Sequence, residues 1–517
     1  MINPIGKKWP LGAALALLVL LMIGLRCGYF LQVRNYPGFA TFLPPDDQAY
    51  YHQTAQQIAA GNLLAENGDL TRGPGYSYFL GIIYRLFPGE ALAAIIIQWG
   101  LGVLTGLLIF LLARRLFSKT VALTACFLYA LYLPALCYEG ALLMAALLTW
   151  LLTAGFYCLL RGIQDGSGRF LALSGLCFGW ALLCRPNNLI FIVFGLLLLF
   201  FRSKDRRDLI WFAAPAAGLY GLLMIRNYLA GSGLFSITSQ GRRVLMNSHF
   251  HQADGIGWQW SESWAAILAG IPEGWGHFMT FLAEDIAGHF TSWLSLNFSK
   301  LYAFFFNYEF SQFIDVYAQQ EIISLLRLPS ISIGILSPLA LIGLLLLLID
   351  RRRPWHLPLA MYFLAGIFSV VIFYILSRFR LPLVPLFCVI GGYALWRLPE
   401  TLLTSKTPGK IALVTTLLVI AWGVNAESTR QAYSDKFMPN AIYNRGIYYA
   451  ARQEYEPAAR DFQRVLAKVS PAANATVYYR ISRQLARCYY QTGQPEKAGA
   501  VQRRLSDLFP EKDRPPE

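Results

Sequence analysis

The sequence predicts an all-α, polytopic membrane protein of about eleven transmembrane helices, with two long outer loops and a C-terminal soluble helical-repeat domain. Three observations lead to this fold class. Of the 517 residues, 56% are hydrophobic and only 14% are charged, whereas a soluble domain has about a quarter of its residues charged. Apolar runs of membrane-spanning length recur through the first 424 residues. From residue 425 onward, the composition becomes that of a soluble protein.

The apolar runs define the predicted transmembrane domain, residues 1–424. A helix needs about 20 mostly apolar residues to cross a bilayer, because its backbone polar groups can bond only to one another there. The first run follows Lys7 and Lys8, as in a signal peptide, but no small-residue cleavage site comes after it, so we expect an uncleaved anchor. The candidate spans are residues 11–31, 91–113, 120–138, 140–160, 170–184, 188–201, 209–225, 330–349, 357–377, 381–397 and 411–424.

The positive charges predict how the protein is oriented. The net charge is +15, and its Lys and Arg residues cluster at the ends of apolar runs, which favours orienting charges over a nucleic-acid surface. By the positive-inside rule we expect a multi-pass protein of the inner cell membrane, with a cytoplasmic N-terminus and a periplasmic or external C-terminal domain. The main clusters are Arg114, Arg115 and Lys119; Arg202, Lys204, Arg206 and Arg207; and Arg351, Arg352 and Arg353.

Two predicted outer connections, residues 32–90 and 227–329, are too long to be simple turns. Long loops on a rigid scaffold are common places for function. The second loop is rich in tryptophan, which we interpret mainly as a set of interfacial anchors. These tryptophans are Trp258, Trp260, Trp264, Trp275 and Trp293.

Residues 425–517 resemble tetratricopeptide repeats. The first copy has the expected small and large packing residues, and the second copy, 40 residues later, repeats most of them. Two copies are fewer than the roughly three needed for independent stability, so we expect this domain to be stabilised by contact with the membrane domain or with a protein partner. A helical hairpin without a binding role is the alternative. The matching residues are Gly446, Tyr449, Ala458 and Phe462, then Ala486, Tyr489, Ala498 and Pro510.

The first outer loop carries two adjacent carboxylates, Asp46 and Asp47, shortly after the first span. Aspartate at a helix N-terminus is favoured by capping and by the helix dipole, which explains one aspartate better than two. Further polar motifs stand at predicted outer ends of spans. They are Arg72-Gly73-Pro74-Gly75-Tyr76, Tyr138-Glu139-Gly140, Arg185-Pro186-Asn187, Arg226-Asn227 and Ser377-Arg378-Phe379-Arg380-Leu381-Pro382.

In their order and spacing, these motifs resemble those of C-fold glycosyltransferases of the protein mannosyltransferase and lipid A aminoarabinose transferase group, glycosyltransferase family 39-like. The resemblance covers roughly residues 1–400, with Gly73 standing where many relatives have a second proline. It implies transfer of a sugar, with inversion, from a polyprenyl-phosphate-linked donor to a lipid, glycan or protein acceptor at the outer face of the membrane. Such an activity belongs to glycosylation in the cell envelope.

The resemblance also implies which residues are functional. It assigns acceptor activation or metal contact to Asp46 or Asp47, and Glu139 is either a second catalytic acid or a helix cap. Glycosyl transfer needs a base for the acceptor hydroxyl and positive charge for the leaving phosphate, which Arg binds in a fork. An arginine at a span end can instead extend to lipid headgroups. The candidate phosphate ligands are Arg72, Arg185, Arg226, Arg378 and Arg380.

The sequence establishes no cofactor. His249 and His251, with Asp254 nearby, are weak candidates for a divalent metal site, because loop histidines without a metal are common. The chain has no Gly-rich nucleotide-phosphate loop, which favours a lipid-linked donor over a nucleotide sugar. The alternatives are an O-antigen polymerase or ligase, a membrane-anchored scaffold, and a transporter. A transporter would carry ionisable residues near the middle of the membrane.

Overall fold

The structure is a computed structural model that describes residues 11–64, 71–257, 262–350, 353–404, 406–471 and 475–510. Every regular element in these residues is a helix, and an isolated bridge between Ile256 and Ile375 is the β-type pairing described there. The predicted all-α membrane fold class is confirmed. Of the residues discussed above, Lys7, Lys8, Trp258, Trp260, Arg351 and Arg352 lie outside the described residues.

Each predicted span overlaps one long or medium-length apolar helix, although the third span also includes a second, short helix. Six helical stretches of the described residues are long and apolar enough to cross a membrane, and five shorter apolar helices accompany them, while the number of crossings stays a prediction. The helices are α1 (Leu11–Val33), α4 (Ala91–Leu116), α5 (Lys119–Ala130), α7 (Ala145–Asp165), α8 (Gly168–Cys184), α9 (Leu189–Arg202), α10 (Arg207–Leu229), α16 (Ile333–Ile349), α17 (His356–Val371), α19 (Val384–Thr404) and α20 (Thr407–Val424).

The third predicted span, 120–138, differs from the structure. Helix α5 ends at Ala130, and a separate short helix, α6 (Pro134–Glu139), follows. Pro134 explains the break, because its ring would collide with the carbonyl group four residues earlier, that of Ala130. Proline is tolerated in the first turn of a helix, where it stands in α6.

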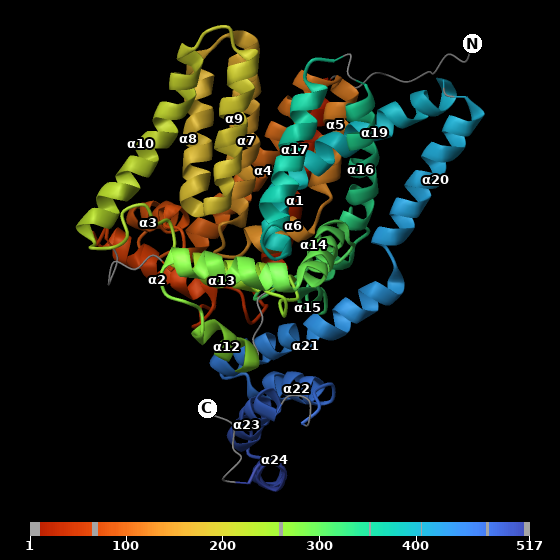
Figure 1. The fold of residues 1–517 in the computed structure, drawn as a ribbon. Helices are drawn as coiled ribbons and strands as arrows, with labels where there is room; N and C mark the ends of the chain where they lie inside the picture. Colours follow the sequence, from red (N-terminus) through yellow and green to blue (C-terminus); the bar gives the residue numbers. More distant parts are fainter. Residues whose placement is uncertain are drawn as a thin grey trace.

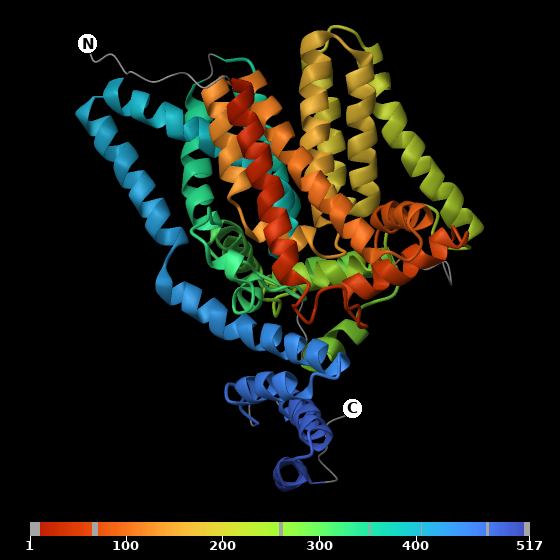
Figure 2. The same cartoon turned by 180° about the vertical axis from the view of Figure 1, so that it is seen from behind.

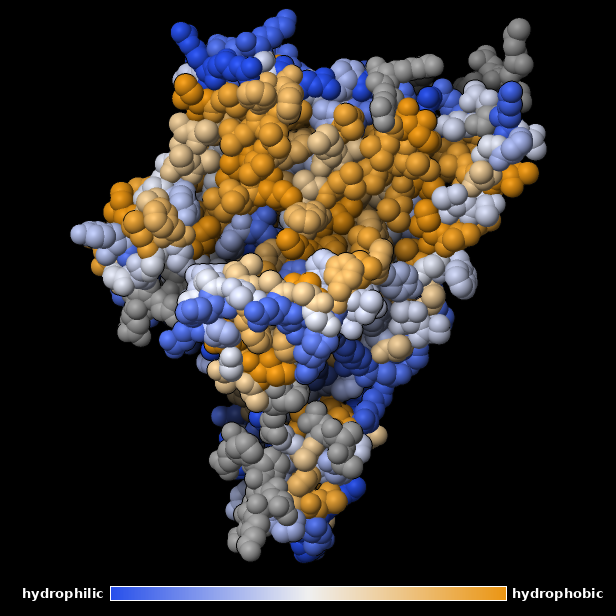
Figure 3. Space-filling view, viewed as in Figure 1, coloured by the Kyte–Doolittle hydropathy of each residue, from blue (hydrophilic) through white to orange (hydrophobic). Residues whose placement is uncertain are grey.

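The long helices form the upper bundle in Figures 1 and 2, and the helices of the two outer loops lie across its lower end. On the face that Figure 3 shows, a broad band of apolar residues covers the upper bundle, with hydrophilic residues above it, as a bilayer requires. The loop helices are α2 (Asp47–Ala59), α3 (Gly75–Leu86), α11 (Gly241–His249), α12 (Glu262–Ala269), α13 (Trp275–Gly288), α14 (Phe290–Phe305) and α15 (Val316–Gln320).

Basic connections and long loops occupy opposite ends of the bundle. The α9–α10 and α16–α17 connections, which contain Arg206 and Arg353, lie at the upper end in Figure 1, away from α2, α3 and α13. This separation agrees with the charge-based topology. Which end faces the cytoplasm stays a prediction.

The C-terminal region consists of α21 (Glu427–Ala451), α22 (Tyr455–Leu466), α23 (Ala475–Gln491) and α24 (Pro495–Leu508), each packed on the next. A Cβ atom on Gly446 would lie 2.8 Å from the Phe462 ring, so this predicted pair of small and large residues is in contact. The assignment of these helices as tetratricopeptide repeats stays a prediction.

Helix α21 joins the C-terminal region to both outer loops. The buried Arg445 forms ion pairs with Asp461, at 2.7 Å, and with Glu321 before η2 (Ser324–Arg327), at 2.9 Å. Lys436 pairs with Asp254 of the second loop at 2.8 Å. The Tyr448 hydroxyl donates to the Asp46 carboxylate of the first loop at 2.9 Å. The C-terminal helices are therefore docked against the loops that surround the site described next.

Candidate functional site

A cavity of about 1240 Å³ lies where the lower end of the bundle meets both outer loops and the C-terminal helices. Its volume slightly exceeds the usual range of small-molecule sites, so it can hold a sugar together with a phosphate group. Charged and aromatic side chains from distant parts of the chain line it. They include Asp47, Tyr51 and Arg72 from the first loop, Arg185 after α8, Arg243, Trp264 and Trp275 from the second loop, Tyr374 and Arg378 after α17, and Val477 and Arg480 from α23.

The two adjacent aspartates point to different places. Asp46 is the N-cap of α2, and its carboxylate accepts a hydrogen bond from the Gln48 backbone N–H at 3.0 Å. It is only 3% exposed and also accepts the hydrogen bond from Tyr448. Asp47 is the first helical residue, whereas Asp46 has extended backbone angles, so the two side chains leave the chain in different directions. Asp47, and not Asp46, therefore faces the cavity.

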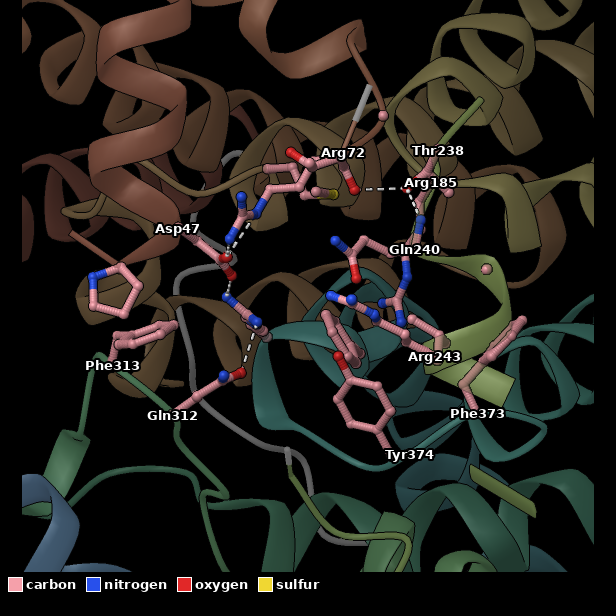
Figure 4. A pocket seen from close by; sticks show the side chains of 18 of the residues that line it. Asp47, Arg72, Arg185, Thr238, Gln240, Arg243, Gln312, Phe313, Phe373 and Tyr374 are labelled. Carbon is pink, nitrogen blue, oxygen red and sulfur yellow. Dashed lines mark hydrogen bonds and ion pairs between the residues drawn. The ribbon is translucent and has the colours of Figure 1, made fainter. Parts of the chain in front are cut away.

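Two arginines hold the Asp47 carboxylate, as Figure 4 shows for Arg72. The Arg72 Nε donates to one carboxylate oxygen at 2.7 Å, and an Arg378 nitrogen donates to the other. Arg378 also donates to the Gln312 side chain at 3.0 Å, which orients its guanidinium. Burial by itself would raise the pKa of Asp47, but the charges of Arg378 and Arg72 outweigh burial and lower this pKa below its usual value. Asp47 is therefore an ionised carboxylate at neutral pH.

Further cations lie across the cavity from Asp47. Figure 4 shows Arg185 and Arg243 on the opposite side, beside Tyr374. The Arg185 guanidinium stacks on the Phe379 ring, with 3.3 Å between its central carbon and the ring centroid. Burial lowers the pKa of Arg185 to about 10, so it is still cationic at neutral pH. No ion pair with a carboxylate is described for Arg185, which makes it available to an anionic ligand.

Of the predicted catalytic and phosphate-binding residues, four lie outside the cavity lining, and Asp46 is the first of them. Glu139 is 2% exposed and pairs with Arg26 of α1 at 2.8 Å. Arg226 donates to the backbone carbonyl of Leu64. These contacts link helices and loops to one another, so the predicted catalytic role of Glu139 and the predicted phosphate contact of Arg226 are not supported by the geometry.

Arg380 also has a structural position. It is fully buried and donates to the carbonyl oxygens of Phe304 and Tyr308, at 3.0 and 2.9 Å, and to the Glu309 carboxylate at 3.1 Å. It stands in the short helix α18 (Ser377–Arg380), two residues after Arg378, so the two side chains leave the helix about 200° apart. Arg378 reaches the cavity, whereas Arg380 fastens α18 to the end of α14. The geometry therefore does not support its predicted phosphate contact.

The predicted histidine cluster is not formed as expected. His249 accepts a hydrogen bond from the Trp293 indole at 3.2 Å, and burial together with Lys300 lowers the pKa of His249 to about 4. Asp254 pairs with Lys436. His251 instead contacts Asp285, which lies 34 residues later in the chain. The close spacing of His249 and His251 in the sequence does not bring their side chains to one site, because α11 ends at His249 and the chain turns there.

Several residues that line the cavity were not predicted from the sequence. Arg243, Gln312 and Tyr374 stand in segments without a recognisable motif, and Arg480 comes from the C-terminal helices. The basic dipeptide Arg242-Arg243, in a loop that has few other basic residues, is the one signal that could have indicated a cation in the site. The others are brought to the cavity only by tertiary packing.

The comparison with protein families concerns the segment that contains Arg72 and Arg185. Residues 71–228 match the family model described as dolichyl-phosphate-mannose-protein mannosyltransferase. The predicted family resemblance is confirmed over this segment. No curated protein matches the chain significantly.

Solved structures with similarity to the chain include the following two. One is the archaeal oligosaccharyltransferase AglB from Archaeoglobus fulgidus, in complex with an inhibitory peptide and a dolichol-phosphate, with 16% identity, 87% of this chain and 56% of that chain covered, and a TM-score of 0.45. The other is ArnT from Cupriavidus metallidurans bound to undecaprenyl phosphate. It is 14% identical, the match covers 88% of this chain and 81% of that chain, and the TM-score is 0.44. The chain thus spans little more than half the length of the archaeal enzyme.

Proposed function

We propose that the protein is a glycosyltransferase that transfers a sugar from a polyprenyl-phosphate-linked donor to an acceptor at the external face of the membrane. One observation carries this proposal: an ionised carboxylate, Asp47, faces the cationic Arg185 across a cavity at one end of a membrane bundle. The family match over residues 71–228 supports the same donor class, since its description names a dolichyl-phosphate-linked sugar.

In the proposed reaction, Asp47 accepts the proton of the acceptor hydroxyl as the oxygen of that hydroxyl bonds to the anomeric carbon of the sugar. The bond between this carbon and the phosphate oxygen breaks, and polyprenyl phosphate leaves with one more negative charge. Arg185 stabilises that charge, and the effect is strongest in a site from which water is excluded. An attack from the side opposite the phosphate inverts the anomeric configuration, which matches the placement of Asp47 across from Arg185.

The remaining residues have supporting roles in this proposal. Arg72 and Arg378 keep Asp47 ionised and fix its orientation, while their cavity-facing groups add to the positive potential around the phosphate. Val477 and Arg480 of α23 form part of the cavity wall, so we assign the C-terminal helices to the acceptor side. A protein, glycan or lipid acceptor, or a partner protein that delivers it, would contact this wall.

Sugar transfer from a radiolabelled polyprenyl-phosphate sugar, measured in proteoliposomes, tests the function directly. We expect labelled acceptor product with the wild-type protein and none with empty liposomes. Product that forms only from a donor carrying a complete oligosaccharide repeat would favour a polymerase or ligase instead.

The outer-face assignment makes a separate prediction. Reporter fusions after Lys119 and Arg207 should report a cytoplasmic location, because these sites follow basic clusters. Fusions after Gly255 and Arg430 should report an external location. A cytoplasmic signal after Gly255 would place the cavity on the opposite side and contradict the proposed use of an external donor.

The paired arginines predict a shift in pH dependence. In Arg378→Gln, Asp47 loses the cation that contributes most to lowering its pKa, so this pKa rises towards or above its usual value. Because the base must be ionised, activity falls as the pH drops through its pKa, and the acidic limb of the kcat profile should move to higher pH. In the wild-type protein, ionised Asp47 contributes stability that is lost as the pH falls through its lowered pKa, and in the variant this contribution should be reduced or absent. Profiles of kcat against pH that coincide for both proteins would contradict this role of Arg378.

A further inference from the structure

The second outer loop contains a small helical unit that forms part of the cavity wall. Helices α11, α12 and α13 share a core of five buried hydrophobic residues: Met246, Phe250, Trp264, Phe278 and Leu282. The helices have only 9, 8 and 14 residues, and helices of this length are marginal without further support. The unit nevertheless has to hold Arg243 and Trp264 in the cavity wall. Small cores of this kind commonly need a staple such as a metal ion.

Three potential metal ligands meet at one end of this unit. His251 follows α11, Asp285 stands in the last turn of α13, and His289 follows α13 directly. The Nδ1 atoms of His251 and His289 lie 2.5 and 3.4 Å from the same Asp285 carboxylate oxygen. The two imidazole rings face each other, with 4.0 Å between their centroids. One ligand atom from each residue lies within 4.8 Å of the other two.

The surroundings of the three side chains suit a metal site. The His251 backbone N–H donates to the second Asp285 oxygen at 3.0 Å, and this contact orients the carboxylate as outer-shell hydrogen bonds do in metal proteins. The His289 Nδ1 also lies 3.0 Å from the Asp285 carbonyl oxygen, and an Nδ1–H that donates to this oxygen leaves Nε2 as the metal-binding nitrogen of His289. The Asp285 side chain is 7% exposed and the His289 side chain 47% exposed, so an ion would be held on a buried ligand and could still be reached from solvent.

We propose that His251, Asp285 and His289 bind a divalent transition metal ion, with zinc as the best fit. Two imidazoles and one carboxylate are ligand types that zinc accepts at about 2.0 to 2.2 Å, with water completing a tetrahedron. The ion would tie the end of α11 to the end of α13 and so hold the cavity wall that carries Arg243. The role is structural, and it stands independently of the sugar-transfer proposal.

Metal analysis of the purified full-length protein tests the site. The protein carries an affinity tag without histidine, is loaded with zinc, and is freed of unbound metal before elemental analysis. We expect about one zinc per chain in the wild type and in His277→Gln, and little in the double variant His251→Gln/His289→Gln. His277 is a matched control because it is an exposed histidine on the same helix α13. Wild-type protein without zinc, or a double variant that retains it, would overturn the proposal.

A second measurement needs no substitution and so does not depend on whether a variant folds. Chelation with EDTA should accelerate limited proteolysis between α10 and α14 of the wild-type protein, and added zinc should restore protection. Cobalt bound in place of zinc should show the visible absorption of a tetrahedral site. Proteolysis that is unchanged by EDTA would overturn the stapling role.

Discussion

Asp47→Asn should reduce sugar transfer by about 10²- to 10⁴-fold, because it removes general-base assistance while nearly preserving side-chain shape. The amide oxygen can still accept one of the hydrogen bonds that Arg72 and Arg378 donate to the carboxylate. We therefore expect the variant to fold, to enter the membrane and to bind donor. The measurement is transfer of radiolabelled sugar in proteoliposomes, together with a donor-binding assay on the same preparation.

Asp46→Asn is the matched control for this variant, because it makes the same chemical change at the neighbouring residue. Asparagine caps a helix about as well as aspartate, and the loss of a cap costs about 1 kcal/mol. The variant should keep most of the transfer activity, because Asp46 binds Gln48 and Tyr448 and does not line the cavity. Full activity in both single variants and in the double variant would rule out Asp47 as the base.

The second large effect is expected at Arg185. Arg185→Ala should lower kcat/KM for the donor by roughly 10- to 100-fold, because it removes a contact to the phosphate of the bound donor and to the charge that develops on it, and hydrogen bonds to charged groups contribute about 1.5–3 kcal/mol each. Arg185→Lys should recover part of this loss, because it restores the charge without the planar fork. The KM for the acceptor should change little.

Arg34→Ala is a suitable control for the arginine series. Arg34 is exposed directly after α1, so removing it changes the net charge in the same way without altering the cavity. It should leave kcat/KM for the donor and the KM for the acceptor unchanged. If Arg34→Ala impaired use of the donor as much as Arg185→Ala does, the effect would come from general surface charge, and the assignment of Arg185 to the phosphate would be wrong.

Much of the fold could be predicted from local chemistry. Apolar length predicted every helix of the bundle, because a bilayer leaves backbone groups no partner except one another. The change in composition at residue 425 coincides with the boundary between α20 and α21. Pro134 was the local exception. Its effect on α5 was readable in the sequence, yet the apolar run around it suggested one continuous span.

The site was predictable only in part. Asp47, Arg72, Arg185 and Arg378 belong to motifs that stand at one end of the bundle, so topology was enough to bring them near one another. Neighbours in the sequence could not be separated in this way. Asp46 differs from Asp47 because the backbone changes from extended to helical between them. Arg380 differs from Arg378 because a helix turn points the two side chains in different directions.

By itself, therefore, the sequence determined the helical membrane scaffold, the end of it that carries the chemistry, and the residue types available there. These follow from hydrophobic length and charge position, which act over a few turns of chain. Only the tertiary structure decided which carboxylate faces the cavity and that α23 closes one wall. It also brought His251 beside Asp285 and His289. Such contacts join residues far apart in the chain, and they depend on how whole helices and loops pack, for which no local pattern exists.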